Sequence, residues 1–379
     1  MIRIGIDTRP ALHQRTGVGN YVFNLIRSLI DLGEKEEFLL FSNSLKNDFD
    51  IKELKGLEKC VIRHRRFPNA IFSPLWNRFG GGIADMLLNE ANVIHFTGQI
   101  PKKSGKLPSV ATVHDIFNVK HPESVAPEFR VDPRFMSRAL KSMDALIAVS
   151  EYTKRDVCDF LDIPENKVKV IHFGVEPKPN INQDTKALTE TNKKHFGISG
   201  EYILCVGTIE TRKNYLKMVE AFAIIQKSFP SIKLVIIGGN GWASDQVHEK
   251  IKRLQIENSV YCIGYVHPSE LGSIYKNASA FVFPSIYEGF GLPVLEAFSF
   301  KTPIAISNIT SLPEVAGDAA LGFNPEDPED IARKTVRLLE DSDLRKNLIH
   351  QGEKRISEFT WEKSAIKTLQ VYRDLGKSP

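Results

Sequence analysis

Short apolar runs alternate with segments of helical period along most of the chain. Each run has the length of a buried strand, and between runs the apolar residues recur every three or four positions. Such alternation is typical of a parallel sheet covered by helices. In the first half we predict strands at residues 2–6, 38–41, 60–62, 93–96, 109–113, 145–149 and 169–171, and helices at 21–32 and 135–143.

The pattern stops in the middle of the chain and then begins again. Residues 176–199 contain Pro177, Pro179 and a polar run, which indicates a linker with a first short helix. The second series predicts strands at 202–207, 233–238, 260–263, 280–283, 303–306 and 320–323, and helices at 216–225 and 361–374. We therefore expect an α/β protein with two Rossmann-like, doubly wound domains. Ligands of such sheets bind outside the carboxyl ends of the strands.

Composition is that of an ordinary globular protein. The 379 residues are 42% hydrophobic and 25% charged, enough for two or three domains. A net charge of +4 does not by itself indicate nucleic-acid binding, and no nucleic-acid partner is expected. The four cysteines are widely spaced, which favours a reduced, cytoplasmic compartment. Neither a signal peptide nor an apolar stretch near the roughly 20 residues that span a bilayer is found in the sequence.

One segment in the second half places two acids around a Gly-Phe-Gly-Leu-Pro turn. Glu288 is expected on the loop after a buried strand, and Glu296 in the first turn of the next helix, which Pro293 favours. Gly289 and Gly291 lack Cβ atoms, so an anion can approach the backbone amides at the helix start. The helix dipole explains Glu296 alone, but not Glu288 with both glycines. Two acids beside an anion site indicate a ligand with hydroxyls and phosphates.

This segment resembles the Glu-x7-Glu motif of the retaining glycosyltransferases of the group 1 family (family 4), and the resemblance covers nearly the whole chain. It implies the GT-B architecture: an acceptor-binding domain at 1–178, a nucleotide-sugar-binding domain at 179–360 facing it across a cleft, and a helix at 361–379 that returns to the first domain. It also implies that Glu288 lies near the sugar and is catalytic. Glu296 would bind the ribose hydroxyls, because a carboxylate suits a vicinal diol. Phe290, Gly291 and Leu292 would line the donor diphosphate.

A pair of cations follows the first strand of the second series. Arg212 and Lys213 lie at a strand-to-helix turn, where they can hold a diphosphate by charge-assisted hydrogen bonds. A basic surface turn is the other interpretation. The spacing resembles the family's Arg-Lys-Asn signature, which implies that both cations stabilise the leaving diphosphate and that Gly207 and Thr208 line the donor site. Many relatives carry Arg directly after the glycine, where this chain has Thr208.

Two further motifs lie in the first half. The loop at residues 15–21 contains Gly17 and Gly19 but no complete dinucleotide fingerprint. The resemblance implies that it closes over the donor phosphates. His114 ends an apolar strand, and the resemblance implies a hydrogen bond to the donor sugar, with a structural histidine as the alternative. Asp115 either orients the imidazole or caps the next helix.

Two further loops, one rich in glycine and one containing Glu314, can be interpreted either as part of the site or as structural. The loop at residues 238–242 either approaches the nucleotide or is a plain glycine turn, and Glu314 is interpreted as mainly structural.

No metal or cofactor is expected, since the nucleotide sugar is a substrate. Two Asp-x-Asp triplets match the metal-binding motif of the other large glycosyltransferase fold. The one at 48–50 has no strand before it, and the one at 341–343 is interpreted as a helix cap. Cations from side chains and helix ends would then neutralise the diphosphate.

Basic residues cluster in the first half, either as solvated surface or as a patch for anionic lipid or a lipid-diphosphate acceptor at the cytoplasmic membrane face. They are Arg63, Arg65, Arg66, Lys102, Lys103 and Lys106.

We therefore expect transfer of a hexose from a nucleotide diphosphate sugar, UDP-glucose or GDP-mannose, to a hydroxyl of a glycan or lipid-linked acceptor in cell-surface polysaccharide synthesis. Domain closure would exclude water. A nucleotide-sugar epimerase of the same fold, a phosphorylase or a non-catalytic binding protein are alternatives. A phosphorylase needs a cofactor lysine site, which we do not find, and a binding protein would be expected to lose Glu288 or Lys213. An NAD-dependent oxidoreductase has the least support.

Overall fold

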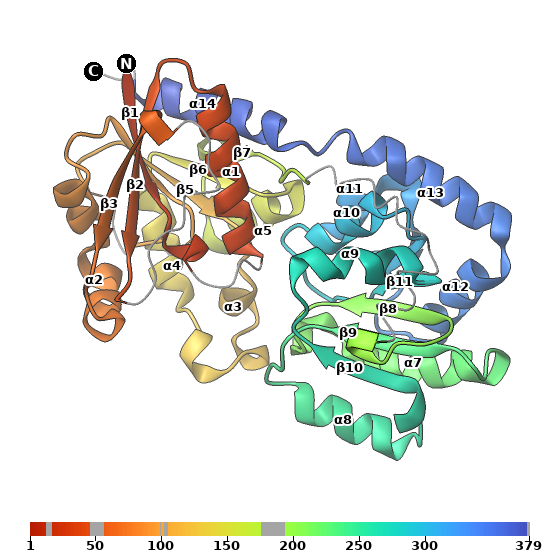
Figure 1. The fold of residues 1–379 in the computed structure, drawn as a ribbon. Coiled ribbons are helices and arrows are strands. Elements are labelled where there is room, and N and C mark those ends of the chain that lie inside the picture. The colour runs from red at the N-terminus through yellow and green to blue at the C-terminus, as the bar shows by residue number, and fades with distance from the viewer. Residues whose placement is uncertain (13–16, 46–56, 99, 102–104, 176–193, 377–379) are drawn as a thin grey trace. The chain divides into compact units, whose positions relative to one another are not determined.

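The computed structural model describes residues 1–12, 17–45, 57–98, 100–101, 105–175 and 194–376, which form two compact units (Figure 1). Unit 1 comprises Met1–Pro122, Phe129–Gly174 and Phe359–Pro379, and unit 2 comprises Glu123–Glu128 and Val175–Glu358. Each unit is a parallel sheet with helices, as the alternation of apolar runs predicts. Most of the predicted linker at 176–199, and the predicted boundary at residue 178, lie outside the described residues.

The described part of unit 1 contains a seven-stranded sheet in the order β3-β2-β1-β4-β5-β6-β7, with every neighbouring pair parallel. The strand order reverses between β1 and β4, as in doubly wound sheets. Each predicted strand of the first half overlaps one of these. The strands are β1 (Ile2–Asp7), β2 (Glu36–Asn43), β3 (Cys60–Arg65), β4 (Val93–Phe96), β5 (Ser109–Val113), β6 (Ala145–Ala148) and β7 (Val168–Val170).

The final helix, α14 (Trp361–Gly376), belongs to unit 1 (Figure 1). It packs against α1 (Val18–Leu32) and contacts β1 and β4. Its helix-spaced apolar side chains are buried, so the predicted return of the last helix to the first domain is confirmed. They are Trp361, Ala365, Leu369 and Tyr372. The remaining helices of unit 1 are α2 (Asn69–Leu87), α3 (Phe117–Lys120), α4 (Pro133–Ser142) and α5 (Glu151–Leu161).

The helix α2 is absent from the sequence prediction. It buries Phe72, Trp76 and Ala84 in the core of unit 1. It also contains Pro74 and three consecutive glycines, which lower helix propensity. Its outer side carries further apolar residues, so the sequence lacks the polar face by which an amphipathic helix is usually recognised.

The described part of unit 2 contains a six-stranded parallel sheet in the order β10-β9-β8-β11-β12-β13, and its order reverses between β8 and β11. Each predicted strand of the second half overlaps one of these. The strands are β8 (Tyr202–Val206), β9 (Lys233–Ile237), β10 (Val260–Gly264), β11 (Ala280–Phe283), β12 (Ile304–Ser307) and β13 (Leu321–Phe323). The helices are α7 (Tyr215–Ser228), α8 (Ser244–Arg253), α9 (Pro268–Asn277), α10 (Leu292–Ser299), α11 (Leu312–Ala316), α12 (Pro328–Glu340) and α13 (Ser342–Ile356).

Membrane-spanning helices were also sought. Among the described residues, none of the helices is both long enough and apolar enough to cross a bilayer.

Candidate active site

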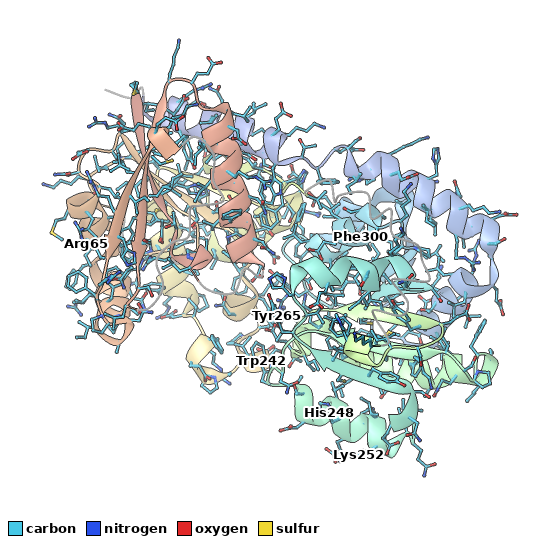
Figure 2. The ribbon with its side chains drawn as sticks, in the orientation of Figure 1. Arg65, Trp242, His248, Lys252, Tyr265 and Phe300 are labelled. Carbon is cyan, nitrogen blue, oxygen red and sulfur yellow. The ribbon has the colours of Figure 1, made fainter. Side chains whose placement is uncertain are left out.

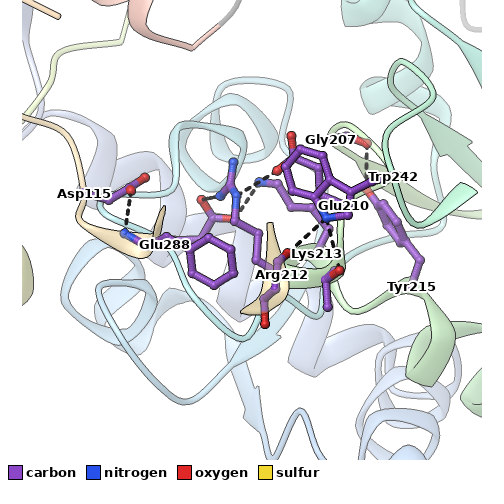
Figure 3. Close-up of polar contacts among 11 residues, drawn as sticks. Asp115, Gly207, Glu210, Arg212, Lys213, Tyr215, Trp242 and Glu288 are labelled. Carbon is purple, nitrogen blue, oxygen red and sulfur yellow. Dashed lines mark hydrogen bonds and ion pairs between the residues drawn. The ribbon is translucent and has the colours of Figure 1, made fainter. Parts of the chain in front are cut away.

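Two cations and one carboxylate meet where the strand order of unit 2 reverses (Figure 3). Lys213 Nζ donates to Glu288 Oε1 at 2.5 Å, and Arg212 Nη1 donates to Glu288 Oε2 at 3.0 Å. The cations follow β8 and the acid follows β11, and these two strands are adjacent and parallel. Loops at the carboxyl ends of parallel strands share one edge of the sheet, and a reversal of strand order opens a crevice there. The structure therefore brings together three of the predicted site residues.

The centre of this cluster is buried and strongly charged. Glu288 is 7% exposed and Lys213 is 6% exposed. Burial raises the pKa of Glu288, but the charges of Lys213 and Arg212 lower it more, so the carboxylate is held ionised. Burial lowers the pKa of Lys213, the Glu288 charge opposes this, and the net direction is downward. An additional anion beside Lys213 would stabilise its charged form.

The cations are fixed by a short turn, Thr211–Lys213, and by Asn214. Asn214 is left-handed, with φ 57°, and its side-chain amide donates to the carbonyls of Pro284 (3.1 Å) and Pro325 (2.8 Å). The Ile286 N–H donates to the Arg212 carbonyl at 2.8 Å. The loops after β8 and β11 are thus hydrogen-bonded to each other, which orients the cations toward Glu288.

Glu210 is a member of the cluster that the sequence analysis missed. Its Oε2 accepts from Arg212 Nε at 2.9 Å, so Arg212 bridges two carboxylates. The nearby Trp242 indole N–H donates to Thr211 Oγ1 at 3.2 Å. A signal was present, since Glu210 lies two residues before Arg212 on the same loop, but a single acid in a polar turn is too common to single out.

Glycines allow the loops after β8 and β9 to pack backbone against backbone. A Cβ on Gly207 would lie 3.0 Å from the Lys213 Cε, and Gly207 has φ 147°. A Cβ on Gly238 would lie 2.1 Å from the Gly207 carbonyl oxygen, and one on Gly241 would lie 2.6 Å from the Ile209 carbonyl oxygen. This close approach gives Gly238 and Gly241 a structural reason. Thr208 is half-buried within the same contact.

The loop between β11 and α10 carries Glu288 and ends at Gly291, whose φ of 108° favours glycine. The Ser311 hydroxyl lies 2.9 Å from each of the carbonyl oxygens of Glu288 and Phe290 and is positioned to donate to them. Ser311 was not among the predicted site residues, because its contact crosses between loops. Leu292 is the first residue of α10.

Glu296 is the fifth residue of α10, so the expectation that it lies in the first helical turn is wrong. Pro293 occupies the second position, so the helix begins just before it rather than closer to Glu296. Glu296 is half-buried, and the Tyr275 hydroxyl donates to its Oε2 at 3.1 Å.

His114 lies in unit 1, at the end of β5. Its Nε2 donates to the Thr97 carbonyl at 2.7 Å, which fixes the tautomer, and burial lowers its pKa, so the imidazole is neutral near pH 7. Its ring packs edge-on against Tyr21 at 5.0 Å. Tyr21 belongs to the same motif as Gly17 and Gly19, so two of the predicted motifs lie side by side.

The first-half glycine motif opens helix α1. Gly17 is its N-cap, with φ 43°, and Gly19 is buried in its first turn. Residues 15 and 16 of the motif lie outside the described residues.

A buried chain of hydrogen bonds holds Tyr21 in its contact with His114. The Tyr21 hydroxyl pairs with Thr112 Oγ1 at 3.0 Å, Thr112 Oγ1 with His95 Nε2 at 2.7 Å, and His95 Nδ1 with the Tyr372 hydroxyl at 2.6 Å. Burial lowers the pKa of His95 to about 3. The chain ties β4 and β5 to α1 and α14.

Two aspartates accept hydrogen bonds from backbone N–H groups at helix starts. Asp115 Oδ1 accepts from the Phe117 N–H at 3.0 Å, which supports the capping alternative. Asp341 accepts from the Leu344 N–H at 2.9 Å at the start of α13, as predicted, and the triplet at 48–50 lies outside the described residues. Within the described ranges, no three His, Cys, Asp or Glu side chains are grouped to hold a metal ion.

Two family models match the chain, Glycosyltransferase Family 4 over residues 15–178 and Glycosyl transferases group 1 over residues 189–355. The chain belongs to the group 1 glycosyltransferase family (family 4). A relative, O-antigen chain mannosyltransferase B of Escherichia coli, is 28% identical over 386 residues, which cover 98% of this chain and 100% of the relative.

Solved structures share the fold. Sucrose-phosphate synthase from Thermosynechococcus elongatus matches with a TM-score of 0.77 and 20% identity over 99% of both chains. HepE of Anabaena, solved in complex with UDP-glucose, matches with a TM-score of 0.75 and 15% identity over 98% of this chain and 100% of that one. These are GT-B glycosyltransferases, so the predicted GT-B fold is confirmed. At these identities, the likeness concerns the fold alone.

Proposed function

We propose that the protein transfers a hexose from a nucleotide diphosphate sugar to a hydroxyl group of a saccharide acceptor, with retention of the anomeric configuration and without a metal ion. The observation that carries this proposal is the Arg212–Lys213–Glu288 cluster at the strand-order reversal of unit 2. Family membership supports the reaction class.

The two cations would bind the diphosphate. Arg212 and Lys213 are already paired with Glu288 and partly removed from water. A phosphate oxygen could therefore accept hydrogen bonds from them without a further cost of desolvating the cations. The N-terminus of α10, with Phe290, Gly291 and Leu292, would add backbone N–H donors, which suit an anion. Preorganised donors of this kind are each worth about 3 kcal/mol in the transition state of other enzymes.

In the transfer step, the bond between the anomeric carbon and the diphosphate oxygen breaks while the acceptor oxygen attacks from the same face. The acceptor proton passes to the departing phosphate oxygen, so charge and atoms balance. Glu288 would hold Lys213 and Arg212 in place and stabilise positive charge on the sugar, and Glu296 would bind the ribose hydroxyls. His114 stays a prediction for the donor sugar, and Gly17, Gly19, Gly207 and Thr208 for the donor phosphates.

Mannose is our first choice of sugar, because the relative that matches over its full length is a mannosyltransferase. GDP-mannose is therefore tested first and UDP-glucose second, with a cell-surface polysaccharide precursor as acceptor.

The test is to incubate the protein with each donor and a panel of oligosaccharide acceptors in EDTA, and to assign the new linkage by NMR. We expect one donor to be consumed only with an acceptor, the linkage to keep the donor's anomeric configuration, and Lys213→Met to lower kcat/KM roughly a hundred- to a thousand-fold. An altered nucleotide sugar formed without acceptor would favour the epimerase. An inverted linkage, or activity restored only by a divalent metal, would overturn retention or metal independence respectively.

A further inference from the structure

Helix α2 of unit 1 is apolar on two sides. One side buries Phe72, Trp76 and Ala84 in the core. A second set, at similar spacing, is exposed, and a globular protein normally places polar residues there. The exposed set consists of Ile71 (60%), Leu75 (46%), Phe79 (55%) and Met86 (69%), with Phe67 (53%) just before the helix.

The exposed apolar residues of α2 form one stripe. At about 100° per residue, Ile71, Leu75, Phe79 and Met86 fall within an arc of roughly 80° around the helix. Gly82, which lies within the same arc, has no described atom within 4 Å of its Cβ position, so this point of the stripe is open among the described residues. Scattered single apolar residues need no explanation, but a continuous stripe marks an interaction surface.

Positive charge surrounds the stripe. From Lys59 to Met86 the sequence contains one lysine, four arginines and a single acid, Asp85. Arg65 and Arg66 are exposed immediately before α2, and Figure 2 labels Arg65. Arg78 lies within the helix, with its guanidinium 5.3 Å from the Phe79 ring centroid. Arg63 is paired with Glu90 at 3.2 Å.

A second basic residue group reaches the same helix. The backbone N–H of Lys106 donates to the Asp85 carboxylate on α2, and Lys106 is exposed. Both basic groups of the sequence analysis thus adjoin α2, although Lys102 and Lys103 lie outside the described residues.

We propose that the α2 stripe, defined as Phe67, Ile71, Leu75, Phe79 and Met86, inserts into the interface of an anionic lipid bilayer, with the surrounding cations on the lipid headgroups. An apolar face bordered by Arg and Lys is the pattern of a helix that lies in the membrane plane. The excess of cations over the single acid, Asp85, along this segment favours a lipid surface over a second copy of the chain, because a self-complementary contact would juxtapose its own arginines.

The experiment is flotation of the full-length protein with vesicles of phosphatidylcholine alone or mixed with phosphatidylglycerol. We expect binding to the mixed vesicles that weakens with salt. Leu75→Ser/Phe79→Ser should weaken it roughly ten-fold or more through lost apolar insertion. Arg65→Gln/Arg66→Gln should weaken it by roughly ten- to thirty-fold, since each cation near a charged surface contributes about five-fold.

Matched controls come from the same unit. Phe160 (44%) and Ile366 (52%) are as exposed as Leu75 and Phe79, so Phe160→Ser/Ile366→Ser should bind like the wild type. Arg134→Gln/Arg138→Gln on α4 controls for lost charge. Circular dichroism checks that each variant is folded.

Three results would overturn the proposal: no binding to the mixed vesicles, equal loss in the controls, or a dimer in sedimentation that Leu75→Ser/Phe79→Ser dissociates while vesicles leave the wild type unbound. The assay uses neither donor nor acceptor, so it stands apart from the proposed reaction.

Discussion

The Lys213 ammonium is surrounded by groups that interact strongly with its charge. It lies 2.5 Å from Glu288 Oε1 and 4.8 Å from the Phe283 ring centroid, and its side chain is 8% exposed. Charges in such a place cannot be removed one at a time without leaving a partner unsatisfied. Catalytic and structural contributions of Lys213 therefore need to be separated by experiment.

Lys213→Met is expected to lower the free energy of unfolding by about 3 kcal/mol, because Glu288 stays buried with one of its two cations missing. We also expect kcat/KM to fall roughly a hundred- to a thousand-fold through loss of a donor to the leaving diphosphate. Urea unfolding and transfer assays measure the two effects. As a control, Lys217→Met removes a more exposed pair with Glu220 and should change stability by about 0.5 kcal/mol or less.

The double variant Lys213→Met/Glu288→Leu separates the two roles. Replacing both charges by apolar groups should return most of the lost stability, since buried ion pairs are often no better than apolar contacts. Activity should stay lost. A double variant that is active, or one no more stable than Lys213→Met, would contradict the role given to this pair.

His95 predicts a pH dependence of stability. Its pKa is lowered from 6.5 to about 3 in the folded chain, so below about pH 6.5 the unfolded chain binds a proton that the folded chain does not. Stability should therefore fall with decreasing pH, by about 1.4 kcal/mol per pH unit for this group. The lowered pKa of His114 acts in the same direction.

Urea unfolding between pH 7 and about pH 5 measures this dependence. Carboxyl groups whose pKa is lowered in the folded chain, such as Glu288, change stability mainly below about pH 4.5. His95→Gln should be less stable at pH 7 but should show a shallower slope. An equal slope in wild type and variant would show that His95 is not the group responsible.

At the scale of elements, the loops after β8 and β9 depend on glycine. Gly238→Ala would place a Cβ 2.1 Å from the Gly207 carbonyl oxygen at a φ of 152°, so we expect a loss of about 3 kcal/mol in unfolding free energy. Gly239 has no neighbour within 4 Å of its Cβ position, and Gly239→Ala should change stability by about 0.5 kcal/mol or less. Similar thermal unfolding of the two variants would contradict the backbone packing described for this loop.

The elements that the sequence predicts are those whose side chains report their own surroundings. Strand β11 is buried on both faces and appears as a continuous apolar run, and α14 shows an apolar residue at each turn. The pattern of helix α2 does not reveal the helix in the same way, because its outer face is apolar too. Its exposed stripe and its absence from the sequence prediction have the same cause.

The candidate site was predictable as far as parallel topology goes. Arg212, Lys213 and Glu288 follow strands, and adjacent parallel strands bring such loops together. Glu210 and Ser311 were not, since their contacts depend on side-chain geometry. The His95–Tyr372 hydrogen bond joins residues 277 apart, and no local pattern links them.

At the scale of the whole chain, the last helix completes unit 1 from the far end of the sequence. A chain that ends before Phe359 would lose the cover that α14 gives to α1, β1 and β4. In hydrogen exchange we expect amides of α1 and β4 to lose protection while those of β8 and β11 in unit 2 keep theirs. Equal loss in both units would contradict the assignment of α14 to unit 1.

We propose that unit 2 holds a nucleoside diphosphate without a metal, through Lys213 and Glu296. The most direct measurement is calorimetric titration of the wild type, Lys213→Met and Glu296→Ala with GDP and UDP in EDTA. We predict that one nucleotide binds the wild type and that each variant binds it about ten- to a hundred-fold more weakly, the loss of a charged hydrogen-bond partner. No binding by the wild type, or unchanged binding by both variants, would contradict the claim.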